Sequence, residues 1–102
     1  MIATSSTMRQ SSAALAWLRL ALQQIPAGEV VSYGELARRA GLPGRARQAA
    51  RLLAQGALND LPWWRVLRAD GRIALPATSS LAEEQKRRLL AEGWREPQRR
   101  QR

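Results

Sequence analysis

The sequence predicts a mainly α-helical, winged helix-turn-helix-like domain with one short β-hairpin, and three observations support that prediction. The first is an apolar stripe with helical spacing near the start of the chain. The second is a pair of shorter helical segments joined by a turn that contains glycine. The third is a two-residue Asp-Gly turn between two apolar runs, which is typical of a tight hairpin and predicts the wing.

The first helix is expected to follow a Ser/Thr-rich tail. Residues 1–12 have no hydrophobic periodicity, so they are expected to form a flexible tail, with Ser11 or Ser12 as the helix cap. Pro26 and Gly28 end the helix. Between these limits, apolar residues recur at the three- and four-residue spacing of a face that packs on a core: Leu15, Leu18, Leu22 and Ile25.

Two short helices make the predicted helix-turn-helix. The S-x-x-E pattern of a capping box at residues 32–35 predicts a helix over about 33–40. Gly-Leu-Pro-Gly at 41–44 predicts a turn, and a second helix is expected over about 45–55. An ordinary helical hairpin with a solvated arginine face is the alternative for this segment alone. The second helix has the basic and polar residues of a recognition helix, namely Arg45, Arg47, Gln48 and Arg51.

A β-hairpin and a final helix complete the expected fold. Residues 65–69 and 72–75 flank the Asp-Gly turn at 70–71 and are expected to pair as antiparallel strands. A second capping box at 80–83 starts a helix that stops at Gly93.

Length and charge restrict the function. The 102 residues leave room for one domain, expected over 13–94 and followed by a basic C-terminal tail over 95–102. Lys and Arg outnumber Asp and Glu 17 to 8, and Lys86 is the single lysine. Arginine suits phosphates and guanine edges, so a nucleic acid is the expected partner. A high-GC genome explains the preference for Arg over Lys but does not produce a net charge of +9.

The chain contains neither cysteine nor histidine. This excludes thiol nucleophiles, Cys/His zinc sites and imidazole base catalysis, and no cofactor or metal is expected. An enzyme would need other groups, such as Glu83 and Glu84, but these are typical first-turn helix charges. The sequence has no apolar run that would span a membrane and no signal-peptide pattern, so we expect a cytoplasmic protein. A monomer is expected as well, although the sequence says little about oligomerisation.

Residues 61–66, Leu-Pro-Trp-Trp-Arg-Val, are the most unusual stretch. Side chains alternate along an extended segment, so one tryptophan is expected to face inward and the other outward. One reading is structural, with one indole in the core and the other covering a surface groove. The other reading is functional, because an indole beside a basic face suits an unstacked base, at about 1–3 kcal/mol per base.

Several motifs in order resemble the DNA-binding domain of the O6-alkylguanine-DNA alkyltransferases. Residues 25–34, Ile-Pro-Ala-Gly-Glu-Val-Val-Ser-Tyr-Gly, resemble its start, and residues 41–47 resemble its recognition-helix segment. Residues 62–66 are similar to its active-site Pro-Cys-His-Arg-Val, and residues 85–93 resemble its final helix. Trp63 stands at the position of the reactive cysteine. The chain therefore resembles the alkyltransferase-like branch, in which that cysteine is replaced, commonly by tryptophan.

The resemblance implies a non-enzymatic damage sensor. Such a protein docks in the minor groove of double-stranded DNA that contains O6-alkylguanine, flips the lesion into a pocket without alkyl transfer, and marks it for nucleotide excision repair proteins. By the same resemblance, Tyr33 pushes on the phosphate of the flipped nucleotide and Arg47 fills the vacated place in the stack. The small Ala46 fits a helix pressed into a narrow groove, although helix propensity alone also explains an alanine.

Two sets of site residues follow from the resemblance. The expected DNA-binding residues are Tyr33, Arg45, Ala46, Arg47, Gln48 and Arg51. The expected lesion-pocket residues are Tyr33, Pro62, Trp63, Trp64, Arg65 and Arg72. Trp64 departs from the family histidine, and Arg72 is taken as the substitute for a basic residue that some relatives present after the hairpin. A winged-helix transcription regulator that binds undamaged DNA is the rival interpretation, although a wing does not need an aromatic pair at its base.

Overall fold

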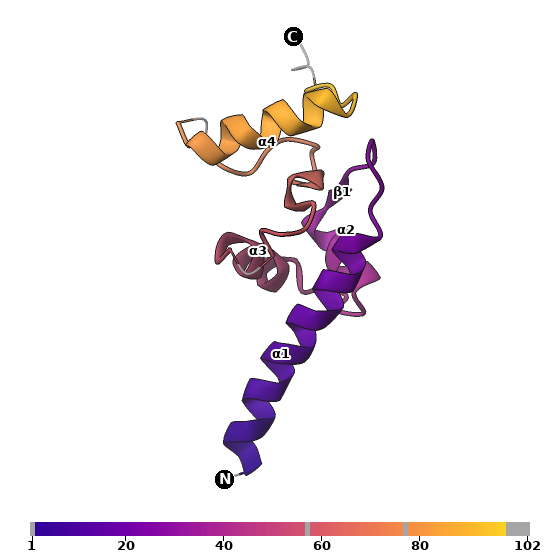
Figure 1. Ribbon diagram of the computed structural model, residues 1–102. Helices are drawn as coiled ribbons and strands as arrows, with labels where there is room; N and C mark the ends of the chain where they lie inside the picture. The colour runs from indigo at the N-terminus through magenta and orange to yellow at the C-terminus, as the bar shows by residue number, and fades with distance from the viewer. Residues whose placement is uncertain (1, 57, 77, 98–102) are drawn as a thin grey trace.

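The computed structural model describes the backbone of residues 2–56, 58–76 and 78–97, and side chains from residue 13 onward. Its described part is mainly helical, as predicted, and none of its helices is long and apolar enough to cross a membrane. Helix α4 lies across the end of the molecule opposite the start of α1 (Figure 1). The elements in chain order are α1 (Ile2–Gln23), β1 (Val31–Ser32), α2 (Tyr33–Arg39), α3 (Ala46–Ala54), the 3₁₀ helix η1 (Trp63–Arg65), β2 (Val66–Leu67) and α4 (Ser80–Ala91).

Helix α1 begins at Ile2, not after a cap at Ser11 or Ser12. The predicted tail is therefore wrong in its backbone conformation over residues 2–12. The segment has neither proline nor glycine to stop a helix, and each residue added to an existing helix gains a hydrogen bond at little further cost. This first part of α1 extends away from the other elements (Figure 1).

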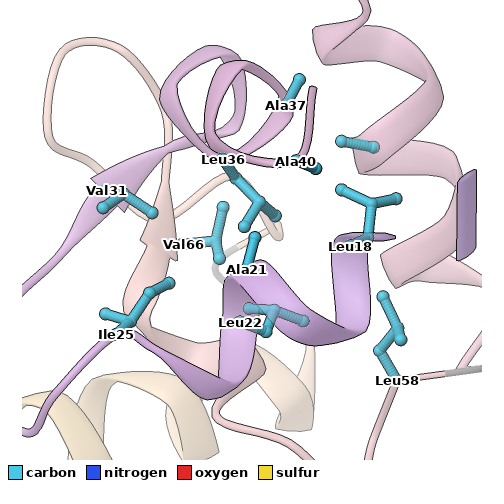
Figure 2. Close-up of a cluster of buried hydrophobic side chains, with 11 residues drawn as sticks. Leu18, Ala21, Leu22, Ile25, Val31, Leu36, Ala37, Ala40, Leu58 and Val66 are labelled. Carbon is cyan, nitrogen blue, oxygen red and sulfur yellow. The ribbon is translucent and has the colours of Figure 1, made fainter. Parts of the chain in front are cut away.

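The hydrophobic core lies where α1 and α2 meet the two strands (Figure 2). Leu18, Leu22 and Ile25 of the predicted stripe are buried there, and Leu15 packs at the margin of the cluster. The buried cluster consists of Leu18, Ala21, Leu22, Ile25, Val31, Leu36, Ala37, Ala40, Ala49, Leu58 and Val66. These contacts fix α2, and α3 behind it, against the long helix.

The helix-turn-helix has nearly the predicted bounds. Ser32 caps α2, because its Oγ accepts a hydrogen bond from the Glu35 amide nitrogen at 3.0 Å. The Glu35 carboxylate does not return to the cap but pairs with Arg38 and Arg39, whose hydrogen bonds lower its pKa to about 2. The turn over 41–44 has a positive φ at both of its glycines, which ends α2 and lets α3 cross it.

The predicted β-hairpin is wrong. Strand β2 pairs with β1 in parallel, with Val31 opposite Val66, and residues 72–75 form no strand. The Asp-Gly turn itself is present, since the Arg68 nitrogen donates to the Arg72 oxygen at 2.9 Å. However, the Arg72 nitrogen donates to the Asp70 side chain at 3.0 Å, so it does not complete the second bond of a strand pair.

Helix α4 has its cap one residue earlier than predicted. Ser79, not Ser80, accepts the capping hydrogen bond, from the Leu81 nitrogen to its Oγ at 3.1 Å. The helix ends at Ala91, close to the predicted stop at Gly93. The bounds of the predicted C-terminal tail stay a prediction, and residues 98–102 lie outside the described part of the chain.

Candidate nucleic-acid interface and base pocket

A pocket of about 170 Å³ lies among α2, α3, η1 and α4. Two residues of the predicted lesion pocket, Tyr33 and Trp63, are on its wall. The prediction missed the others, which are mostly apolar: Ala50, Leu53, Ala54, Gly56, Asn59, Leu75, Leu81 and Gln85. The structure thus brings together residues from four elements around one hollow next to the recognition helix.

Tyr33 is the first residue of α2, directly after the Ser32 cap. Its ring packs against the hydrophobic core and is half-buried. Burial raises the pKa of its hydroxyl above the ordinary value, so the group stays protonated at neutral pH and can donate or accept a hydrogen bond.

Trp63 and Trp64 lie in a 3₁₀ helix, and both are half-buried. The expectation that one faces inward and the other outward is wrong, because side chains do not alternate in a helical turn as they do in a strand. Their ring centroids are 6.1 Å apart, with the planes at 87°. Pro62 caps this turn and is not among the residues on the pocket wall.

Trp64 and Arg65 point to α4, where both bind Glu92. The indole Nε1 donates to Glu92 Oε2 at 3.1 Å, and the guanidinium makes two bonds to the same carboxylate, at 3.0 and 2.7 Å. Arg65 also donates to the Ile25 oxygen at 2.7 Å, and the Arg88 guanidinium lies 4.6 Å from the centroid of the Trp64 ring. Neither Trp64 nor Arg65 is on the pocket wall; together they attach η1 to α4.

The hydrogen bonds from Arg65 lower the pKa of Glu92, as does the bond from Trp64. Burial acts in the opposite direction but is outweighed. The carboxylate is therefore charged at neutral pH and pairs with a largely buried guanidinium.

Arg72 lines a second hollow of about 440 Å³ on another side of α4, with Glu83, Lys86 and Glu96 around it. It does not line the pocket that contains Trp63. Its Nε lies 3.9 Å from the Asp70 carboxylate within its own turn. The structure therefore places Arg72 apart from the other predicted lesion-pocket residues.

The outer face of α3 and its cap is basic. Arg45, Arg47 and Arg51 are exposed, and none of them has an ion pair with the described residues. By contrast, the arginines of α2 and the last turns of α4 are engaged with carboxylates. Ala46 and Gln48 are partly buried. Three cationic groups beside the pocket are therefore available for an anionic partner such as a phosphate backbone.

Gln85 is the missed residue that the sequence could have indicated. Ala82, Gln85 and Leu89 recur at three- and four-residue spacing in α4, and all three are buried. A glutamine on the apolar stripe of a helix requires polar partners inside the protein, so it marks a position with special surroundings.

Residues 17–94 match the family described as 6-O-methylguanine DNA methyltransferase, DNA binding domain. The chain belongs to this family. The resemblance in the sequence is thereby confirmed. A DNA base-flipping protein from Vibrio parahaemolyticus is 43% identical to this methyltransferase-family domain over 75 residues, which is 71% of each chain. Alkyltransferase-like protein 1 of Schizosaccharomyces pombe is 38% identical over 74 residues, or 72% of this chain and 68% of that protein.

A solved structure of the methyltransferase family supports the fold. The crystal structure of Atl1 from Schizosaccharomyces pombe, in complex with damaged DNA containing O6-carboxymethylguanine, aligns with a TM-score of 0.69 and 34% identity. The alignment covers 78% of this chain and 75% of that one. The helical arrangement around the pocket is therefore that of a family DNA-binding domain.

Proposed function

We propose that this protein binds duplex DNA that contains O6-alkylguanine, flips the damaged base into the pocket beside Trp63, and does not transfer the alkyl group. The observation on which this proposal depends is Trp63 on the pocket wall, in a chain that contains no cysteine. Its relatives support the proposal, since two are a DNA base-flipping protein and an alkyltransferase-like protein and one was crystallised on damaged DNA.

The interface supplies the parts that nucleotide flipping needs. The exposed arginines of α3 are suited to the phosphates that border a groove. Extrusion of a nucleotide costs a few kcal/mol of pairing and stacking. We assign Arg47 to the vacated place in the stack and Tyr33 to the phosphate of the flipped nucleotide. The Trp63 indole then offers a face on which the flipped base can stack, and this stacking, worth about 1–3 kcal/mol, offsets much of that free-energy cost.

The proposal includes the absence of catalysis. The carboxylates considered for an enzyme do not line the pocket: Glu84 pairs with Arg87 and Arg88, and Glu83 borders the second hollow. The pocket wall in the described chain consists of aliphatic side chains, amides, a glycine, an indole and a phenol. None of these groups is a good nucleophile at neutral pH.

The bound complex is proposed to mark the lesion for nucleotide excision repair proteins. The expectations of a cytoplasmic location and of a monomer stay predictions. The rival reading as a winged-helix regulator loses its main structural support, because residues 72–75 form no strand and thus no hairpin wing.

Two measurements test the proposed function. Titration of one duplex with and without a single O6-methylguanine is expected to give tighter binding to the damaged duplex. Mass analysis of that duplex after incubation is expected to find the methyl group still on the base. Equal affinity for the two duplexes would contradict recognition of damage, and loss of the methyl group would contradict the absence of catalysis.

A further inference from the structure

Gln85 joins α4 to the backbone that follows Trp63. Its side chain is buried, at 3% exposure, and its Nε2 donates to two carbonyl oxygens, that of Trp64 at 3.1 Å and that of Val66 at 3.0 Å. A side-chain amide has two N–H groups, so both of its donors are used. One side chain of α4 therefore holds the main chain on either side of Arg65.

The two carbonyls lie where η1 changes into β2. The amide nitrogen of Val66 donates to the Trp63 oxygen and closes the 3₁₀ turn. The Trp64 oxygen comes after that bond, and the chain is already extended at Val66, so no further turn can satisfy it. Val66 is 1% exposed, and a buried carbonyl requires a hydrogen-bond partner. The Gln85 amide supplies the donors for both oxygens.

These bonds affect Trp63 because they fix the backbone next to it. The Trp63 side chain leaves the chain one residue before the first of the two bound carbonyls, and its indole is on the pocket wall. Rotation of η1 about its axis would turn the indole away from the pocket and would break the bonds to Gln85. Glu92 also attaches η1 to α4, but through the side chains of Trp64 and Arg65, whereas Gln85 binds the main chain itself.

On the basis of the proposed function, we infer that Gln85 is a positioning residue, whose amide nitrogen holds η1 so that Trp63 presents its ring to the flipped base. The carbon chain of Gln85 forms part of the pocket wall, but the inferred role belongs to its two donors. The preference for damaged DNA then depends on a pair of hydrogen bonds that lie within the protein.

The experiment measures the affinity of each variant for one duplex with and without a single O6-methylguanine. Gln85→Met removes both donors and keeps a neutral side chain of similar length. Its preference for the damaged duplex is expected to fall roughly five- to tenfold below that of wild type, since a turned indole loses part of its stacking on the base. Its affinity for the undamaged duplex should change by less than about twofold, because the exposed arginines of α3 are intact.

Two further variants separate positioning from a general loss of stability. Gln85→Lys restores N–H donors on a chain of similar reach, so it is expected to recover most of the preference. Leu89→Val, in the same buried stripe of α4, is expected to lower the melting temperature and leave the preference unchanged. If Gln85→Lys loses the preference as Gln85→Met does, the donors are not what matters. If Leu89→Val loses it too, the preference follows stability alone. Either result refutes the positioning role.

A double-mutant cycle tests whether Gln85 acts through Trp63. Trp63→Ala, Gln85→Met and the double variant are titrated with the damaged duplex. If Gln85 positions the indole, its substitution should change the affinity by less than about twofold once the indole is absent. Additive losses would mean that Gln85 acts independently of Trp63, contrary to the inference.

The outcomes distinguish this inference from the proposed function. A wild type that binds the two duplexes equally contradicts the proposed function itself. A wild type that prefers the damaged duplex, together with a folded Gln85→Met that prefers it as strongly, leaves the proposed function standing and overturns the role of Gln85.

Thermal unfolding of each variant checks that it is folded. If Gln85→Met does not fold, NMR of the wild type supplies the test. The two side-chain amide protons of Gln85 are expected to exchange slowly with solvent, both in the free protein and on the damaged duplex, because they are bonded to the Trp64 and Val66 oxygens. Rapid exchange in the complex would show that these bonds are not kept when the lesion is bound, and the inference would fail.

Discussion

Trp63 and Trp64 are neighbours in the chain but have different surroundings. Trp63 borders the pocket, whereas the Trp64 nitrogen is bonded to Glu92 and its ring lies near the guanidinium groups of Arg65 and Arg88. Substitution of the first indole should therefore change what the pocket binds. Substitution of the second should loosen the attachment of η1 to α4.

The Trp63→Cys variant is expected not to restore efficient alkyl transfer. A free thiol with a pKa of about 8.5 is mostly protonated at neutral pH, and the thiolate is the nucleophile. The chain has no histidine to take the proton, and the charge of Arg65 is already engaged by Glu92. The measurement is transfer of radiolabel from a duplex with labelled O6-methylguanine to the protein. The double variant Trp63→Cys with Trp64→His should transfer more label than the single one.

Rapid stoichiometric labelling of the single Trp63→Cys variant would contradict this argument. The double variant also loses the hydrogen bond from Trp64 to Glu92, so its fold is checked by circular dichroism before the comparison. Wild-type protein serves as the unlabelled control because it contains no thiol.

Arg47→Ala is expected to weaken binding to the damaged duplex by about tenfold or more. Without the guanidinium, nothing fills the place that the flipped base leaves in the stack, so less of the free-energy cost of unstacking is offset. Arg95→Ala is the control: it removes the same charge from another exposed position, after α4. Its expected loss is roughly twofold. Fluorescence anisotropy of a labelled duplex measures both, and similar losses would indicate that binding is diffuse electrostatics.

At the scale of elements, Glu92 connects η1 to the end of α4. Glu92→Gln is expected to lower the free energy of unfolding at pH 7 by roughly 1.5–3 kcal/mol, the usual worth of hydrogen bonds to a charged group. The pKa of Glu92 is lowered in the folded state, so its stabilisation is present above the ordinary carboxyl pKa and is lost as the pH falls through the lowered one.

Urea unfolding of wild type and Glu92→Gln from pH 7 to pH 3 measures this effect. The difference between them should shrink below about pH 5, as the carboxylate becomes protonated in the unfolded and then in the folded state. Glu96→Gln is the control, since Glu96 pairs with Lys86 on the surface, with both side chains at least half exposed. Its effect should stay within about 0.5–1 kcal/mol. A Glu92 difference that is independent of pH would contradict the linkage.

Local signals in the sequence predict some of these elements and not others. The S-x-x-E pattern and the glycine turn predict α2 and α3 almost to the residue. An N-cap side chain and a helix-ending glycine act on the backbone next to them, so the nearby sequence is enough to predict both. The parallel pairing of Val31 with Val66 was not predictable in this way, since it joins segments far apart in the chain. The Asp-Gly turn misled the prediction because a local turn does not decide whether its flanks pair.

In the candidate site, too, some features follow from the local sequence and others depend on long-range packing. Motif position grouped Tyr33 with Trp63, and both line one pocket, while the role of that pocket in binding a lesion stays a prediction. It did not place Arg72, Trp64 or Arg65, whose partners are set by where α4 packs. The apolar wall includes Leu53 of α3 and Leu81 of α4, which line the same pocket only in the folded chain.

At the scale of the whole molecule, the net charge of +9 is expected to dominate affinity for any duplex. If about three to five phosphates are contacted, binding should fall roughly 50- to 500-fold between 50 and 200 mM salt. The ratio of affinities for damaged and undamaged duplex should change by less than about threefold over that range, because a pocket supplies the discrimination. Titrations at several salt concentrations measure both slopes, and a ratio that collapses with salt would argue against a pocket.

The arrangement of the four tryptophans makes the protein its own optical probe of lesion binding. Trp17 is 48% exposed on α1, Trp64 is held in the contacts between η1 and α4, and Trp94 follows α4. None of these three residues lines the pocket. A base that stacks on Trp63 should quench that indole alone, and the emission of the others should form a constant background. Trp63→Phe is therefore expected to abolish most of the quenching while the protein still binds the damaged duplex by anisotropy. Quenching that persists in this variant would place the flipped base elsewhere.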